Sequence, residues 1–139
     1  MENSCSYCKI PIKFESVDDF FKTLENTHDK QYAAVASCIN NFPLDWKIQC
    51  LNENPDLLKF ITDKTEELCR LTVDNYGYAL EYVPEQMKTP ELCRLAVENT
   101  GLALAFVPEK LKTPEMCRLA VENDGFAFQY VPKHLRDQI

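Results

Sequence analysis

Apolar residues recur in the C-terminal half of the chain with a period of 24 residues. Three consecutive rows, which begin at Thr65, Thr89 and Thr113, align without gaps, and neighbouring rows agree at most positions. Each row contains one apolar stripe with the three- and four-residue spacing of a helix, which in the second row is Leu92, Cys93, Ala96 and Val97. A shorter apolar segment follows the glycine of each row. The pattern predicts two short helices per row.

The residues around each stripe indicate where these helices begin and end. Thr89 is a good N-cap and Pro90 suits the first helical position, so the first helix of the second row is predicted from Pro90 to about Asn99. Gly101 is expected to end it with a left-handed residue. The second segment is predicted over 102–107, followed after Pro108 by one more turn.

A unit of this length cannot bury its own apolar stripe, so neighbouring units are expected to stack. The predicted fold class is therefore all-α, with short helix-turn-helix repeats stacked as a small solenoid behind an N-terminal helical cap. The chain is expected to form one continuous domain made of an N-terminal arm (1–14), a helical cap (15–42), a degenerate repeat (43–64) and three repeats (65–136).

The N-terminal half supports this division. Ser16 followed by Asp19 indicates a helix start, and a second helix is predicted over about 29–40. Residues 43–61 read as a decayed copy of the unit after a two-residue deletion. Residues 9–14 alternate, but Pro11 favours an edge strand or an extended arm.

The repeated pattern LC-x-x-AV-x-x-x-G-x-A followed by VP and Leu resembles a known family. These are short tandem helical repeats, found in many bacterial proteins and some large viruses and described only as a domain of unknown function. In the second row the matching positions are Leu92, Cys93, Ala96, Val97, Gly101, Ala103, Val107, Pro108 and Leu111. The resemblance implies a helical-repeat fold and no catalytic residues.

Charge and cysteine content narrow the classes of partner and compartment. The formal net charge of −7 argues against nucleic acid and against an anionic membrane surface, since both require basic patches. No apolar run is long enough to cross a bilayer. Seven cysteines without an export signal favour a reducing compartment. We therefore expect a cytoplasmic protein, or one in the host cytosol if it is a viral or bacterial effector.

The cysteines fall into two groups. Cys69, Cys93 and Cys117 recur with the repeat, and stacked helices lie too far apart for a disulfide or a shared metal, so these thiols are expected to pack in the core. Cys5 and Cys8 form a C-x-x-C pair, which is half of a structural zinc site. The missing ligands could be His28, Cys38 or Cys50. We expect two unligated thiols and no cofactor, with zinc binding and a redox pair as the alternatives.

Two polar residue types also recur with the repeat. Arg70, Arg94 and Arg118 each have an acid three residues before and four residues after, which favours a ladder of salt bridges over an anion-binding row. Asn75, Asn99 and Asn123 precede the glycines by two residues and are expected to serve helix ends through side-chain bonds to the backbone.

No catalytic motif is present, so we expect a non-enzymatic protein–protein interaction module, either an adaptor or an inhibitor or effector. Its partner is another protein, which could carry a basic surface. A zinc-dependent module organised by Cys5 and Cys8 and an enzyme with an unrecognised site are the alternatives. Tyr76 and Asp124 are expected to face solvent, whereas Tyr78 and Phe126 could equally pack on a neighbouring unit. Candidate partner-binding residues vary between rows or lie beside the turns: Tyr76, Tyr78, Glu81, Thr100, Lys110, Asp124, Phe126 and Gln129.

Overall fold

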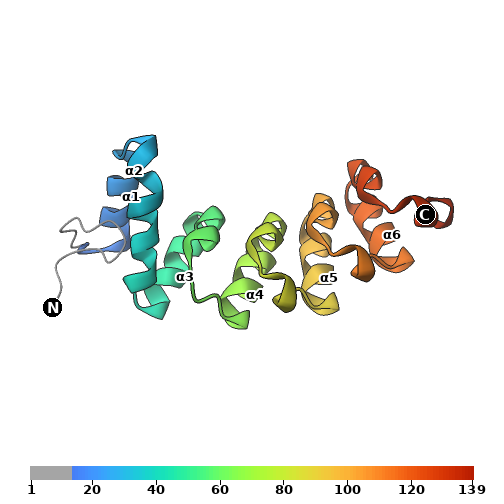
Figure 1. Ribbon diagram of the computed structural model, residues 1–139, viewed down its shortest axis with the longest axis horizontal. Coiled ribbons are helices and arrows are strands. Elements are labelled where there is room, and N and C mark those ends of the chain that lie inside the picture. The colour runs from blue at the N-terminus through green and yellow to red at the C-terminus, as the bar shows by residue number, and fades with distance from the viewer. Residues whose placement is uncertain (1–13) are drawn as a thin grey trace. The chain divides into compact units, whose positions relative to one another are not determined.

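The structure, a computed structural model, describes residues 14–139, which form helices and connecting turns without any strand. The predicted all-α class is confirmed. The chain divides into two compact units, Met1–Asp63 and Lys64–Ile139, and each is described by itself (Figure 1). The N-terminal arm, including Cys5 and Cys8, lies almost wholly outside the described residues.

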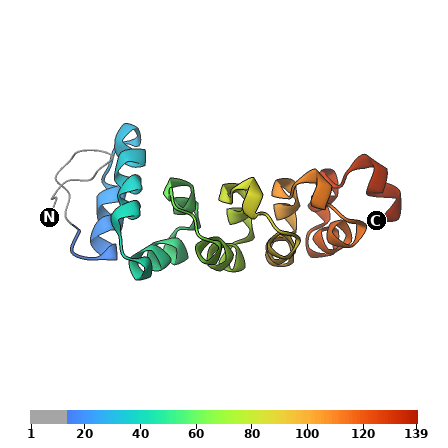
Figure 2. The ribbon, with the colours of Figure 1, turned by 60° about the horizontal axis from the view of Figure 1, so that its bottom comes forward.

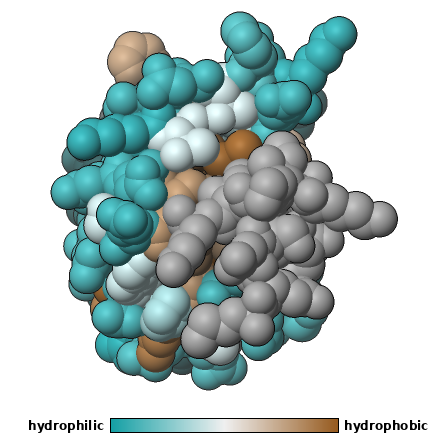
Figure 3. Space-filling view, turned by 90° about the vertical axis from the view of Figure 1, so that its left-hand side faces the viewer, coloured by the Kyte–Doolittle hydropathy of each residue, from teal (hydrophilic) through white to brown (hydrophobic). Residues whose placement is uncertain are grey.

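The first unit begins with the helix expected from its N-cap. Ser16 Oγ accepts a hydrogen bond from the Asp19 amide at 3.1 Å, as predicted. The helices of this unit are α1 (Val17–Glu25), α2 (Asp29–Ala36) and α3 (Leu44–Glu53), with the 3-10 helices η1 (Ser37–Asn41) and η2 (Pro55–Phe60). The succession of α3, one extended residue and η2 is the same as in each unit of the repeat. Outside the grey atoms, hydrophilic side chains cover much of the surface seen in Figure 3.

Aromatic packing and one asparagine hold the first unit together. The Phe20 side chain is fully buried, and its ring lies 5.2 Å from that of Phe14 and 5.0 Å from that of Phe42, in edge-to-face contacts. The Asn40 amide donates to the Phe60 carbonyl at 2.8 Å and accepts from the Thr62 amide at 2.8 Å. Asn40 thereby joins η1 to the end of η2.

The second unit contains three copies of one α-helix followed by two 3-10 helices. Thr65, Thr89 and Thr113 cap the α-helices, because each hydroxyl accepts the amide of the third residue that follows it, at 3.2 Å. The three α-helices lie side by side, and the 3-10 helices that begin at the three glycines form a second row (Figures 1 and 2). The bounds are α4 (Glu66–Asn75), η3 (Gly77–Tyr82), η4 (Glu85–Met87), α5 (Pro90–Asn99), η5 (Gly101–Phe106), η6 (Glu109–Leu111), α6 (Pro114–Asn123), η7 (Gly125–Tyr130) and η8 (Lys133–Gln138).

The glycines of the repeat have a different purpose from the one predicted. The expectation that Gly101 ends α5 in a left-handed conformation is wrong, because Thr100 is the C-cap, with an extended backbone at φ −143°, and no glycine of the chain is left-handed. A Cβ on Gly77 would instead lie 2.5 Å from the Ala96 carbonyl oxygen, and one on Gly101 equally close to that of Ala120. Glycine is needed there because the helix of the next unit approaches so closely.

The core of the second unit follows the repeated apolar stripe. Cys69, Cys93 and Cys117 are fully buried and form no disulfide, which confirms that these thiols pack in the core. Leu80 and Leu104 from the 3-10 helices are also fully buried.

Candidate functional site

Asparagine side chains join each unit of the repeat to the one before it. Asn99 accepts from the Gly77 amide at 3.1 Å and donates to the Asp74 carbonyl at 2.7 Å. Asn123 makes the equivalent bonds with Gly101 and Glu98, both at 2.9 Å. The asparagine side chains do hydrogen-bond to the backbone at helix ends, as expected. Asn99 and Asn123, however, bond to the end of the α-helix in the preceding unit and not to the end of their own helix.

Two lysines with largely buried side chains join adjacent units. The ammonium of Lys88 lies 2.9 Å from a Glu85 carboxylate oxygen and donates to the Phe106 carbonyl at 3.0 Å. Lys112 repeats this arrangement with Glu109 at 2.7 Å and the Tyr130 carbonyl at 3.2 Å. These bonds and the asparagine bonds hold adjacent units at a fixed distance.

This fixed spacing produces two equivalent grooves on the α-helical face of the second unit. The groove between α5 and α6 has a volume of about 590 Å³, and the groove between α4 and α5 has about 480 Å³. Nearly every residue that lines one groove lies 24 positions from a residue that lines the other. Arg94 belongs to both grooves, with Arg70 in one and Arg118 in the other.

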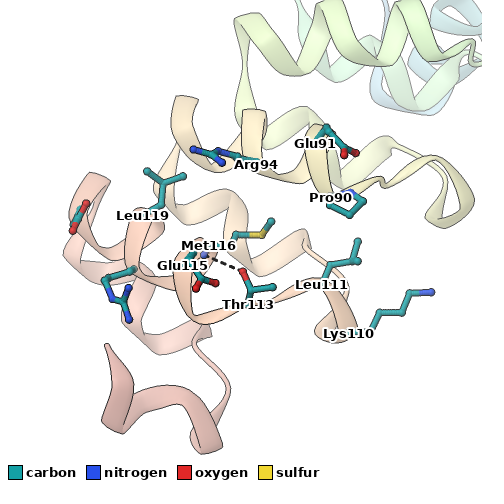
Figure 4. Close-up of a pocket in the computed structure, with 11 residues that line it drawn as sticks. Pro90, Glu91, Arg94, Lys110, Leu111, Thr113, Glu115, Met116 and Leu119 are labelled. Carbon is teal, nitrogen blue, oxygen red and sulfur yellow. Dashed lines mark hydrogen bonds between the residues drawn. The ribbon is translucent and has the colours of Figure 1, made fainter.

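Each groove has an apolar floor and a charged rim. In the groove between α5 and α6, Pro90, Leu111 and Met116 supply apolar surface. Met116 lies near the centre of the lining residues, whereas Lys110 extends away at the edge (Figure 4). The rims carry glutamates as well as arginines, so each groove presents charges of both signs beside its apolar floor. This combination suits a polypeptide better than a uniformly charged ligand.

The arginines of the rims do not form the predicted ladder of salt bridges. Arg94 pairs with Glu98 at 2.9 Å, but Arg118 donates to the Gln138 carbonyl at 3.2 Å. Arg70 has no ion pair among residues 14–139. The ladder prediction is therefore wrong at two of its three arginines, because an exposed guanidinium gains little from a single pair in water.

Several of the predicted partner-binding residues lie at contacts between units. The Tyr78 ring lies 6.4 Å from that of Phe106 in the next unit. Thr100 and Asp124 are half-buried beside Gly77 and Gly101, and the Asp124 carboxylate accepts the Phe126 amide at 2.9 Å. Asp124 therefore faces solvent less than expected.

The other candidates are more accessible. Tyr76 is 38% exposed and Phe126 is 78% exposed, and Glu81, Lys110 and Gln129 are exposed as well. Only Lys110 of all eight candidates lines a groove. Positions that vary between rows therefore do not mark the grooves. The available signal was the opposite one: Arg70, Arg94 and Arg118 are exposed and yet identical in all three rows.

The described thiols are poorly suited to nucleophilic chemistry. Burial raises the pKa of Cys93 to about 11, partly offset by Lys88, and raises the pKa of Cys50 to about 12, with Glu53 adding to the effect. Within residues 14–139, no three His, Cys, Asp or Glu side chains converge in a way that could hold a metal ion. His28 is exposed, whereas Cys38 and Cys50 are buried.

Comparison with known proteins finds one similarity. Residues 89–136, the second and third rows, match the model of a family described as domain of unknown function (DUF4116). The match covers roughly a third of the chain, and the description of the family names no activity. Searches of curated proteins and of solved structures found no match. None of the described helices has the length and apolar character needed to cross a membrane.

Proposed function

We propose that the chain is a non-enzymatic protein-binding module, built as a short solenoid, that binds a polypeptide segment along the two grooves of its α-helical face. The observation that carries this proposal is the recurrence of one groove in successive units, with arginine and glutamate at equivalent positions and leucine or methionine at the apolar ones. A single ligand that lies across the helices would contact equivalent residues in both grooves. The buried free thiols Cys69, Cys93 and Cys117 suit a reducing compartment such as a cytosol.

The exposed arginines favour a ligand over a purely structural role. Several exposed positions of the row change, for example at Gln86, Lys110 and His134, although Glu67, Glu91 and Glu115 are exposed and identical like the arginines. The arginines do not change, although only Arg94 pairs with an acid. A residue that is exposed, identical in each unit and largely unused by the fold is best explained by contact with something outside the fold.

Arg118 already shows how such a contact is made. Its guanidinium donates to the main-chain carbonyl of Gln138, in the last residues of the chain. Arginine presents several donors in a fixed fork, so Arg70 and Arg94 can bind the carbonyls or carboxylates of another segment in the same manner. Apolar side chains of that segment would then occupy the floors around Met116 and Leu92.

The spacing of the units sets the spacing of the ligand. Packed helices lie about 8–10 Å apart. A polyproline II segment advances about 9.3 Å in three residues and returns its side chain to the same face. We therefore propose that the ligand is an extended segment with apolar residues at every third position. Basic residues beside them would meet the glutamates of the rims and suit the net charge of −7.

Selection of peptides from a random displayed library on the full chain tests this proposal. We expect enrichment of apolar residues three positions apart, and a loss of affinity of at least about tenfold, or about 1.4 kcal/mol, in the triple variant Arg70→Gln, Arg94→Gln and Arg118→Gln. The control variant Lys22→Gln, Lys30→Gln and Lys133→Gln changes the net charge equally at exposed positions outside the grooves.

Equal binding of the selected peptides to both triple variants would refute the groove as the binding site. Enrichment of apolar residues seven positions apart would refute the extended conformation and indicate a helical ligand instead, because seven residues advance a helix by about 10.5 Å. A library that yields no specific peptide would refute the proposed function itself.

A further inference from the structure

The last unit of the repeat ends on an apolar surface that its counterparts in the earlier units do not expose. We define the end face as Val121, Gly125, Phe126 and Phe128. Leu80 and Leu104 occupy the position of Phe128 in the first two units and are fully buried, but Phe128 is 41% exposed. Phe126 is 78% exposed, and Val121 is half-buried where Val73 and Val97 are buried. The face therefore matches the surfaces by which one unit packs on the next.

Gly125 indicates what kind of group this face fits. Gly77 and Gly101 are required because a Cβ there would lie 2.5 Å from a carbonyl oxygen of the next helix. A Cβ on Gly125 would meet no atom within 4 Å, and its φ is not left-handed. Nothing in the described chain requires glycine at this position, although Gly125 begins η7 as Gly101 begins η5. A close approach by another helix would require it.

The backbone of the last unit offers the same hydrogen-bonding groups as the earlier units. Asn99 donates to the Asp74 carbonyl and accepts from the Gly77 amide. The equivalent groups of the last unit are the Glu122 carbonyl and the Gly125 amide. Within residues 14–139, no side chain makes the corresponding pair of bonds with them. They form an acceptor and a donor at the spacing that an asparagine side chain satisfies.

The C-terminal helix η8 covers only part of the end face. The Arg136 guanidinium lies over the Phe128 ring at 5.5 Å and donates to the Val131 and Gln129 carbonyls. Arg136 thus occupies the row position of Lys112 but turns back to its own unit. Phe126 and Gly125 stay uncovered by this contact.

We propose that the end face binds a further helical unit of the same 24-residue pattern, carried by a second polypeptide. The bound helix places a small residue and its carbonyl against Gly125, as Ala120 does against Gly101. An asparagine at its last helical position bonds with Gly125 and Glu122. Phe126 and Phe128 pack against its apolar stripe. This surface is separate from the grooves and does not depend on them.

The three glycines make a direct test possible, because a chain labelled with ¹⁵N-glycine gives only three amide signals. In the covalent arm, a copy of residues 89–112 replaces 137–139, so that it follows Arg136 in register and adds a fourth glycine signal from the copy of Gly101. We expect the Gly125 amide to become protected from hydrogen exchange, as the hydrogen bonds to Asn99 and Asn123 should protect the Gly77 and Gly101 amides. In the second arm, a free peptide with the sequence of residues 89–112 is titrated into the labelled full chain. We expect it to shift the Gly125 signal and to leave Gly77 unchanged.

Matched controls separate docking from nonspecific association. A scrambled peptide should leave the Gly125 signal in place. A peptide with alanine at the position of Asn99 should bind at least about tenfold more weakly. An unprotected Gly125 amide in the covalent arm would overturn the proposal. Protection in the covalent arm, with no shift up to millimolar free peptide, would overturn the role of a second polypeptide and restrict the face to units in the same chain.

Discussion

Replacing Gly101 by alanine should destabilise the second unit far more than the same change at Gly125. The Cβ added at Gly101 would lie 2.5 Å from the Ala120 carbonyl oxygen and 3.0 Å from the Asp124 amide. Both neighbours are backbone atoms, so they cannot move aside alone. The helix α6 would have to shift away from η5.

The magnitude follows from the two interactions that such a shift disturbs. Overpacking of a well-packed contact costs about 1–3 kcal/mol. The shift also stretches the two Asn123 bonds, both 2.9 Å long, and each contributes about 0.5–1.5 kcal/mol. We expect Gly101→Ala to lower the free energy of unfolding by about 2–6 kcal/mol. Gly125→Ala meets no atom within 4 Å, so it should be neutral or stabilise by about 0.4–1 kcal/mol through the unfolded state.

Urea unfolding of the two variants, followed by circular dichroism and by the reactivity of the Cys93 thiol, measures this difference. Cys93 is buried in the second unit, so its reactivity reports that unit directly. If the two substitutions change the urea midpoint equally, then glycine is not required at Gly101 by contact with the next unit. Glycine at position 125 would then no longer indicate a docking helix at the end face.

Three further predictions concern buried polar and thiol groups. Cys93→Ala should keep the fold and cost about 1–2 kcal/mol in urea unfolding, and rapid maleimide labelling of native Cys93 would contradict its burial. Burial raises the pKa of Cys93 from 9.0 to about 11. The protonated thiol therefore stabilises the folded state fully below about pH 9, and this contribution to the free energy of unfolding is lost as the pH rises through 11. The free energy of unfolding should therefore fall above pH 9, by at most about 1.4 kcal/mol per pH unit for this thiol, and less steeply in Cys93→Ala. Lys112→Met should cost about 1–3 kcal/mol in thermal or urea unfolding, because it leaves the Tyr130 carbonyl without its donor, whereas the exposed Lys110→Met should change the stability little.

The helices could be predicted from the sequence because their signals are local. Thr89 and Pro90 mark the start of α5, and the apolar stripe marks the face it buries. The second segment of each row was also expected, but its 3-10 geometry was not. An apolar segment of six residues between an extended residue and a proline is too short for a stable α-helix, and composition alone does not distinguish these two forms.

The contacts between units could not be predicted, because they join residues that lie far apart in the sequence. Asn99 bonds to groups 22 and 25 positions earlier, and the need for glycine at Gly77 arises from Ala96 in the next helix. A single row contains no trace of either contact. The prediction of salt bridges at the arginines was wrong for a different reason. The conformation of an exposed side chain is only weakly determined by its neighbours. The grooves were missed because they exist only when two units are stacked.

The stacking contacts and the proposed binding of a ligand involve different positions of the row, and Arg94 is the residue that distinguishes them best. Its only ion pair, to Glu98, is largely exposed, with 70% of the Arg94 side chain and 45% of the Glu98 side chain accessible. Such a pair contributes about 0.2–0.5 kcal/mol, so Arg94→Gln should barely change urea unfolding. Yet Arg94 lines both grooves, whereas Arg70 and Arg118 line one each. Arg94→Gln should therefore weaken binding of the selected peptides more than Arg70→Gln or Arg118→Gln, measured by fluorescence anisotropy. Equal losses in the three variants would mean that the ligand does not lie across both grooves, and a large loss of stability in Arg94→Gln would mean that the arginine row serves the fold.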